Sequence, residues 1–185
     1  MLLAGCLNQE KANPNTKLSN ENQVKNPINS VNPINNTETN TKTQPEVIQT
    51  KEPDEIKTFT LKEGEICLED GKPVIRLFST TWCPHCVWIK ETFYSTVKKF
   101  VDSGKIIAHH WELDTGDDTL TEIVETEVPE SELVIYKEFN PRGSIPTFVF
   151  GCKYFRVGNG FESTKDLDSE KKEFKAVIES LLQEA

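Results

Sequence analysis

The stretch PVIRLFSTTWCPHCVWIKETFYSTVKKFV, residues 73–101, decides the fold. Its first seven residues are mostly β-branched, aliphatic or aromatic, which predicts a largely buried strand over residues 73–79. From Pro84 to Val101 apolar residues recur at spacings close to 3.6, and Gly104 follows as a stop signal, so we expect an amphipathic helix of about five turns. The two cysteines of CPHC therefore lie at a strand-to-helix junction.

This junction favours thiol chemistry. We expect Cys83 near the N-cap and Pro84 at the first helical position, where its missing N–H costs nothing. Unpaired N–H groups and the helix dipole stabilise a thiolate there, so Cys83 is the predicted nucleophile. Cys86 lies one turn further on and can resolve a mixed disulfide by attacking Cys83. His85 adds positive charge beside the thiolate, which favours the dithiol over the disulfide and predicts an oxidising bias.

Three other uses of a Cys-x-x-Cys pair are less favoured. Structural zinc sites commonly draw four ligands from two such pairs, and the chain has one. Haem attachment requires a histidine directly after the second cysteine, where Val87 stands. A purely structural disulfide across four residues would constrain almost nothing. The sequence therefore predicts a redox-active Cys83–Cys86 pair with no other cofactor and no metal.

Composition divides the chain into a tail and a body. All 16 aromatic residues lie at or beyond Phe59, whereas Leu7 to Glu55 contains none and has 11 asparagines and 5 prolines. Such a tail cannot bury enough apolar surface to offset the roughly 1–2 kcal/mol per residue of backbone ordering entropy. We therefore expect residues 7–58 to form a disordered tether and residues 59–185 to form one folded domain.

Charge and hydropathy exclude two classes of function. The formal net charge is −9, which repels phosphate backbones and argues against nucleic acid as a partner. No apolar run approaches the roughly 18–20 residues of a transmembrane helix, so a polytopic membrane protein is excluded.

The first six residues, MLLAGC, resemble the end of a lipoprotein signal, in which Leu-Ala-Gly precedes a lipidated cysteine. The resemblance implies lipidation of Cys6, a membrane anchor and an extracytoplasmic location, where disulfides persist. Residues 1–5 lack the charged and apolar regions of a working signal, so we interpret residues 1–6 as the remnant of a truncated one. A chance cysteine in a disordered tail is the alternative.

From about Lys72 to its C-terminus the chain resembles the thioredoxin superfamily. WCPHC (82–86) combines the tryptophan of thioredoxins with the Cys-Pro-His-Cys centre of Dsb-type dithiol oxidases, and GSIPT (143–147) resembles the family's cis-proline loop. The resemblance implies an α/β thioredoxin fold, with a central mixed sheet flanked by helices. It also implies a substrate-binding surface in which Pro146 packs against the cysteine pair and the Ile145 backbone pairs with substrate, with Trp82 and Thr147 beside them.

The same resemblance organises the rest of the body. Residues 106–114 match the strand after the first helix, and the 31 residues from Thr115 to Ile145 exceed the thioredoxin spacing, which predicts a modest helical insertion before the cis-proline loop. The remaining expected elements are short helices at 120–126 and 131–139, a hairpin of 148–150 and 154–157, and a closing helix at 169–182 with Ser169 as a candidate N-cap.

One position departs from the family pattern. Thioredoxins and Dsb-type oxidases have a buried carboxylate six residues before the first cysteine, and Leu77 occupies that position here. Proton transfer from Cys86 therefore lacks its usual partner, and Glu112 and His110 are candidate substitutes.

Cys67 and Cys152 are the two remaining cysteines. In the thioredoxin sheet the strands beside them are antiparallel neighbours, so the resemblance places both at the end away from the active site. A Cys67–Cys152 disulfide is one interpretation, and two free thiols are the other.

Together these features predict an extracytoplasmic, membrane-tethered thiol–disulfide oxidoreductase with an oxidase bias. Its partners would be protein thiols or disulfides and a membrane redox protein that recycles it. A reductant, for example one serving cytochrome maturation, is the first alternative. A non-catalytic metal-binding or chaperone-like lipoprotein with the same fold is the alternative from another class.

Overall fold

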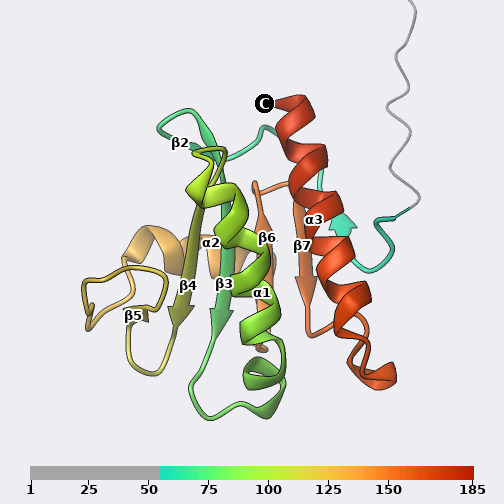
Figure 1. Cartoon of the computed structure of the whole chain (residues 1–185). Coiled ribbons are helices and arrows are strands. Elements are labelled where there is room, and N and C mark those ends of the chain that lie inside the picture. The colour runs from blue at the N-terminus through green and yellow to red at the C-terminus, as the bar shows by residue number, and fades with distance from the viewer. Residues whose placement is uncertain (1–54) are drawn as a thin grey trace, which may run out of the picture. The chain divides into compact units, whose positions relative to one another are not determined.

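The structure, a computed structural model, describes residues 55–185 (Figure 1). The predictions for Cys6 and for residues 7–54 of the tether lie outside the described residues. No helix within residues 55–185 is both long enough and apolar enough to cross a bilayer.

A mixed sheet forms the centre of the described part. Its strands are β1 (Thr60–Leu61), β2 (Leu68–Glu69), β3 (Lys72–Ser79), β4 (Ile107–Glu112), β5 (Asp117–Asp118), β6 (Thr147–Phe150) and β7 (Tyr154–Val157). Hydrogen-bonded neighbours follow the order β1-β7-β6-β3-β4-β5, and β2 pairs with β3 beside this path. β3 and β4 run parallel, whereas the other pairs are antiparallel.

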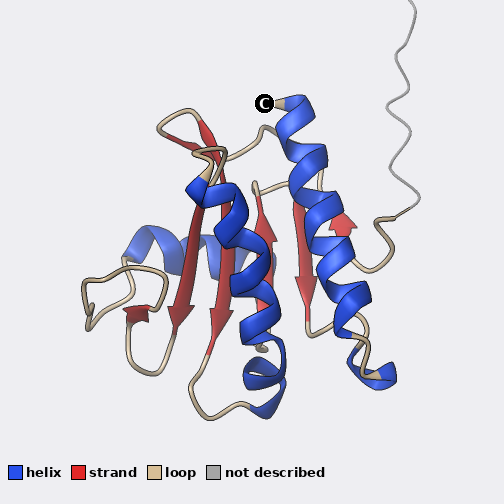
Figure 2. Cartoon of the chain, in the orientation of Figure 1, coloured by secondary structure: helices blue, strands red, loops and turns tan. Residues whose placement is uncertain are grey.

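Helices cover both faces of this sheet (Figures 1 and 2). They are α1 (Pro84–Asp102), α2 (Glu130–Phe139) and α3 (Leu167–Glu184), with a short 3₁₀ helix, η1 (Glu162–Thr164). Side chains of β3 alternate between the faces, so Ile75 and Leu77 pack with α1 and α3 whereas Phe78 packs with α2. The arrangement confirms the predicted α/β thioredoxin fold.

The strand and helix that flank the cysteines form where the sequence predicted them. α1 ends at the predicted stop: Gly104 has a φ of +69°, which suits a residue without Cβ. Its N–H donates to Val101 O at 2.8 Å, and the N–H of Lys105 donates to Phe100 O at 3.0 Å. This pair of hydrogen bonds is a Schellman motif, and it satisfies carbonyls that the last helical turn leaves open.

The insertion contains one helix, not the two that we predicted. α2 forms close to its predicted position, but residues 120–126 make turns and bends. Acidic and hydroxyl side chains compete for the backbone there: Asp117 Oδ1 accepts from Glu125 N at 2.9 Å, and Thr121 Oγ1 donates to Ile123 O at 2.8 Å. Ile123 and Val124 are exposed, so the helix-like apolar spacing does not mark a buried face.

The N-cap of α3 also differs from the prediction. Asp166 is the N-cap, because its Oδ1 accepts from Ser169 N at 2.9 Å. Ser169, our candidate, lies in the first turn and donates its hydroxyl to Asp166 Oδ2 at 2.7 Å. The aspartate prevails because its carboxylate accepts both hydrogen bonds and stabilises the positive end of the helix.

The folded body begins before residue 59, where we placed its start. Lys57 N and Thr58 N each donate to Glu173 Oε1 at 2.5 Å, and Glu173 is itself buried on α3. Arg156 Nη1 pairs with Glu173 Oε2 at 3.1 Å and so neutralises a charge that would be costly to bury alone. These contacts fasten the first described residues to α3.

Candidate active site

The cysteine pair lies at the junction of β3 and α1, as expected. Cys83 is the N-cap of α1 with an extended backbone, Pro84 is the first helical residue, and Cys83 O accepts from Val87 N at 3.0 Å. Both Cys83 and Cys86 are free thiols, and each is only 4% exposed. Burial raises the pKa of Cys86 to about 12, against a backbone hydrogen bond at Thr80 that lowers it.

Two exposed apolar side chains flank the buried pair in the sequence. Trp82 is 71% exposed and Val87 61% exposed, on either side of the two cysteines in sequence. Large apolar groups gain free energy when a partner covers them. Trp82 and Val87 therefore present apolar surface that a partner molecule could cover.

The cis-proline loop lies at the same end of the sheet. Phe78 pairs in register with Thr147, so the loop before β6 meets the segment that leads from β3 to Cys83. The Ile145–Pro146 peptide bond is cis, and Ile145 is half-buried while Pro146 is buried.

Thr147 has a different place from the one that we predicted. Its side chain is fully buried, and its hydroxyl donates to Ser144 O at 2.7 Å, so it shapes the loop and does not face a substrate. Asn140 Nδ2 also donates to Ser144 O, at 2.6 Å, and Tyr136 OH donates to it at 3.2 Å. Sequence reasoning missed Asn140 and Tyr136, because nothing in the spacing of α2 marks residues that reach a loop four to eight positions later.

Two residues from much later in the sequence, Asn159 and Glu162, contact His85. His85 Nδ1 lies 2.8 Å from Glu162 Oε1 in η1. Asn159 Nδ2 donates to His85 O at 2.9 Å and to the other oxygen of Glu162 at 2.8 Å. Burial would raise the pKa of Glu162, but the hydrogen bonds from Asn159 and His85 outweigh it and lower that pKa. No pattern in the sequence predicts this pair, because 77 positions separate its two members.

A polar cavity of about 290 Å³ lies behind Cys86. The position that carries a carboxylate in the resembled family holds fully buried Leu77, and Leu77 pairs in register with His110, as Ser79 does with Glu112. β4 thus places polar side chains next to this part of β3. The cavity is lined by Ser79, Thr80, Thr81, Cys86, Val87, Lys90, His110 and Glu112.

Two observations define the polar character of this cavity. Lys90 Nζ donates to Glu112 Oε1 at 3.0 Å; burial opposes the lysine charge, but hydrogen bonding to Glu112 prevails and raises the pKa of Lys90. The hydroxyl of Thr80, a residue that is 9% exposed, has no hydrogen-bond partner in the described part of the chain. A buried hydroxyl of this kind normally has water or another polar partner.

His110 has a structural place in the same region. Its Nε2 lies 2.6 Å from Ser79 Oγ, and its Nδ1 lies 2.6 Å from Tyr94 OH and 2.7 Å from Thr119 Oγ1. Burial and the charge of Lys90 lower the pKa of His110 to about 3, so the ring is neutral at physiological pH. It joins β3, β4 and α1 through hydroxyl groups.

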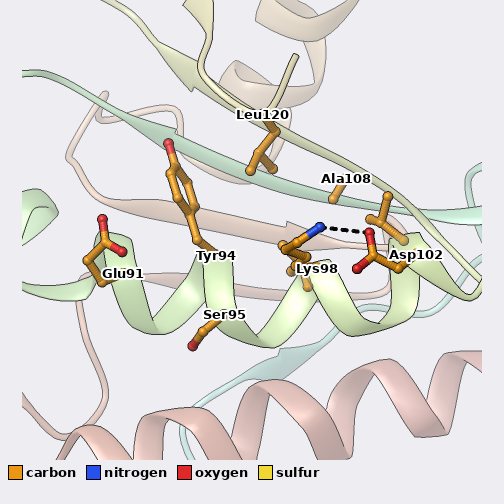
Figure 3. A pocket seen from close by; sticks show the side chains of 9 residues that line it. Glu91, Tyr94, Ser95, Lys98, Asp102, Ala108 and Leu120 are labelled. Carbon is orange, nitrogen blue, oxygen red and sulfur yellow. Dashed lines mark hydrogen bonds and ion pairs between the residues drawn. The ribbon is translucent and has the colours of Figure 1, made fainter. Parts of the chain in front are cut away.

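A second hollow, of about 440 Å³, lies between α1 and the segments that carry Ala108 and Leu120 (Figure 3). Tyr94 and Leu120 extend toward it, and Lys98 pairs with Asp102 at 2.9 Å along its edge. No described cysteine lines this hollow, so it is separate from the dithiol.

A disulfide joins Cys67 to Cys152. Of the two interpretations of these cysteines given by the sequence, the disulfide is confirmed and the two free thiols are not. The Cα atoms of the bridged cysteines are 5.3 Å apart and 85 positions separate them in sequence. Cys67 N also donates to Gly151 O at 2.9 Å, next to the bridge.

Across residues 55–185, no group of three or more His, Cys, Asp or Glu side chains is arranged to hold a metal ion.

Comparisons with known proteins find similarity to a solved structure. No family model matches the chain, and no curated protein matches it. Among solved structures, the germline-specific thioredoxin Deadhead (Thioredoxin-1) of Drosophila melanogaster is similar with 22% sequence identity. The alignment covers 55% of this chain and 82% of that one, with a TM-score of 0.34. The assignment of the fold rests on the sheet order and the flanking helices of this chain.

Proposed function

We propose that this protein is a thiol–disulfide oxidoreductase whose reacting pair is Cys83 and Cys86. One observation carries the proposal: two free thiols, three positions apart, lie at the first turn of a helix, where the dipole favours a thiolate. The Cys83 thiolate attacks a substrate disulfide, and Cys86 resolves the mixed disulfide. In the reverse direction a substrate thiol attacks the oxidised pair.

The protein would act outside the cytoplasmic membrane, anchored through Cys6 and recycled by a membrane redox protein. The Cys67–Cys152 disulfide supports this location, because such bridges persist in oxidising compartments and are rare in the cytosol. The substrates would be protein thiols or disulfides, held at Trp82 and at the Ile145 backbone beside Pro146.

Positive charge at His85 favours the dithiol state and hence an oxidase bias. A reductant that serves cytochrome maturation or other envelope thiols is the second candidate, and the ion pair between His85 and Glu162 favours it, since the carboxylate opposes the histidine charge. A redox titration of the Cys83–Cys86 pair against glutathione separates the two: an oxidase has the more positive potential.

The decisive test captures substrates as mixed disulfides. Cys86→Ser leaves the Cys83 nucleophile but removes the resolving thiol, so substrates should accumulate as mixed disulfides on Cys83. The double variant Cys83→Ser/Cys86→Ser is the matched control and should trap none. Recovery of no Cys83 adduct from the native envelope would overturn the proposal. Zinc or copper bound to the reduced protein and lost on Cys83→Ser, without dithiol turnover, would support the metal-binding alternative.

A further inference from the structure

The buried thiol of Cys86 needs a proton acceptor. Only its thiolate can attack a mixed disulfide on Cys83, yet its burial raises the pKa to about 12. Leu77, which stands where the resembled family has a carboxylate, lies in the apolar core and can accept no proton. The acceptor must therefore come from another element that reaches Cys86.

The cavity behind Cys86 connects this thiol to a carboxylate. Cys86 and Glu112 line the same space of about 290 Å³, enough for several waters at about 30 Å³ each. The buried hydroxyl of Thr80 lines it too and has no partner among the described residues, so it can bond such a water. Lys90 holds Oε1 of Glu112, and no hydrogen bond within residues 55–185 reaches Oε2.

We propose that Glu112, held in place by Lys90, accepts the proton of Cys86 through water in this cavity. The inference rests on the proposed exchange function and names the residue that transfers its proton. The Cys86 thiol gives its proton to the Glu112 carboxylate, and the Cys86 thiolate attacks Sγ of Cys83. The Cys83–Cys86 bond forms as the bond between Cys83 and the substrate sulfur breaks. The protein dithiol is oxidised by two electrons, the substrate disulfide is reduced, and the leaving substrate thiolate takes up the proton.

Neighbouring groups are less suited to this role. Both ring nitrogens of His110 already have hydroxyl partners, and the buried ring resists a positive charge. Asp114 is exposed, and its two oxygens accept from the backbone and hydroxyl of Thr81. Lys90 carries a proton already and holds Glu112 through Oε1.

The charged and titratable groups around this proton path come from every element packed on it. They are Cys83 at the N-cap of α1, Lys90 and Tyr94 from α1, His110 from β4, Asp114 from the loop after it, Asp117 from β5 and Tyr136 from α2. Among them Lys90 contacts Glu112 directly, with its Nζ 3.0 Å from Oε1. Loss of the lysine charge should therefore move the pH dependence of the resolving step toward higher pH.

Stopped-flow reaction of the reduced full chain with the chromogenic disulfide dithiobis(nitrobenzoate) separates the two steps. All chains carry Cys6→Ser and are reduced selectively so that the Cys67–Cys152 bridge stays closed, and the dithiol alone reacts. The first phase depends on reagent concentration and reports attack by Cys83, whereas the second does not and reports resolution by Cys86. For Glu112→Gln we expect an unchanged first phase and a second phase that is about 100-fold slower near neutral pH. That second phase should then rise about tenfold per pH unit, because hydroxide becomes the acceptor.

The matched control is Glu91→Gln, which removes the same charge from the exposed side of α1 and should leave both phases unchanged. Should Glu112→Gln fail to fold, Lys90→Met serves in its place, and its second-phase profile should shift to higher pH. Equal second-phase rates and profiles in the wild type and in Glu112→Gln, or no shift in Lys90→Met, overturn the inference and leave the proposed function standing. A wild-type chain that shows a first phase without a second overturns both.

Discussion

The two ends of β3 each have a cysteine pair, and they are built in opposite ways. At the end that leads into α1, Cys83 and Cys86 are free thiols beside a polar cavity of about 290 Å³. At the other end Cys67 and Cys152 form a disulfide. The same side-chain chemistry thus occurs once as a reactive pair and once as a bridge.

Hydrogen bonds and packing close the bridged end. Cys67 N donates to Gly151 O at 2.9 Å, Gly151 N donates to Val74 O at 2.8 Å, and Val74 N donates to Cys67 O at 3.2 Å. Gly151 has a φ of +62°, and a Cβ there would lie 2.6 Å from the Leu181 side chain, so a larger residue would be strained and would displace Leu181. The dithiol end instead keeps space and an unpartnered hydroxyl. A pair that exchanges partners needs room and a route for a proton, whereas a bridge needs neither.

Removal of the bridge should give the largest effect on stability. On the chain-entropy model a link across 85 positions stabilises the fold by about 4–5 kcal/mol, so we expect Cys67→Ala/Cys152→Ala to lose about 2–5 kcal/mol of unfolding free energy. Urea unfolding without reductant measures this loss. Exchange activity of the folded fraction should persist, because the bridge lies at the far end of the sheet.

Cys83→Ala/Cys86→Ala is the control for that experiment. It should abolish exchange and change the unfolding free energy by about 1 kcal/mol, since it removes two small side chains that make no covalent link. Equal losses of stability in the two double variants would contradict the division between a structural and a reactive end.

The reactive end was predictable in part from sequence because its main signals are local. The apolar run before Cys83, the proline at the first helical position and the stop at Gly104 act within one or two turns, and β3 and α1 form as expected. The loop at Pro146 was accessible through its motif. Local signals also misled, since Leu120, Ile123 and Val124 have helical spacing but aspartate and threonine side chains bind the backbone there.

The rest of the candidate site depends on contacts between distant residues. Glu162 reaches His85 across 77 positions, and Asn140 supports the cis-proline loop through a side-chain hydrogen bond. The sequence made Glu112 a candidate, but it did not predict the contact with Lys90, which forms because α1 packs against β4. No periodicity in the chain encodes such pairs, because each depends on how two finished elements dock.

Acid should lower the unfolding free energy, because His110 near the dithiol is buried in its neutral form. His110, buried and neutral, has a pKa near 3 in the folded state against 6.5 in the unfolded state, so the unfolded chain binds more protons between these values. Stability is therefore lost as the pH falls below 6.5, by up to about 1.4 kcal/mol per pH unit from this residue. Urea unfolding at a series of pH values should show a smaller acid loss for His110→Gln than for the wild type.

His109, the residue before His110 on β4, should have the opposite pH dependence. Burial would lower its pKa, but the hydrogen bond with Asp118, at 2.6 Å, prevails and raises it. Its stabilisation is present at pH values below 6.5 and is lost as the pH rises through the raised value. His109→Gln should therefore leave the acid loss in place and flatten the fall in stability on the alkaline side. Identical pH profiles for the two variants would show that the neighbouring histidines do not differ as their surroundings imply.

The smallest expected effect concerns the charge balance at the reactive end. His85 and Glu162 form an exposed hydrogen-bonded pair. Exposed charges interact by about 0.2–1 kcal/mol, so a change of charge there should move the potential of a two-electron couple by at most roughly 5–20 mV. Glu162→Gln removes negative charge near the start of α1 and favours the Cys83 thiolate, so the reduction potential should become more positive. His85→Ala removes the positive partner and should shift it the other way. A glutathione titration of both variants measures these shifts, and shifts of the same sign would mean that the pair acts on the dithiol through loop geometry and not through charge.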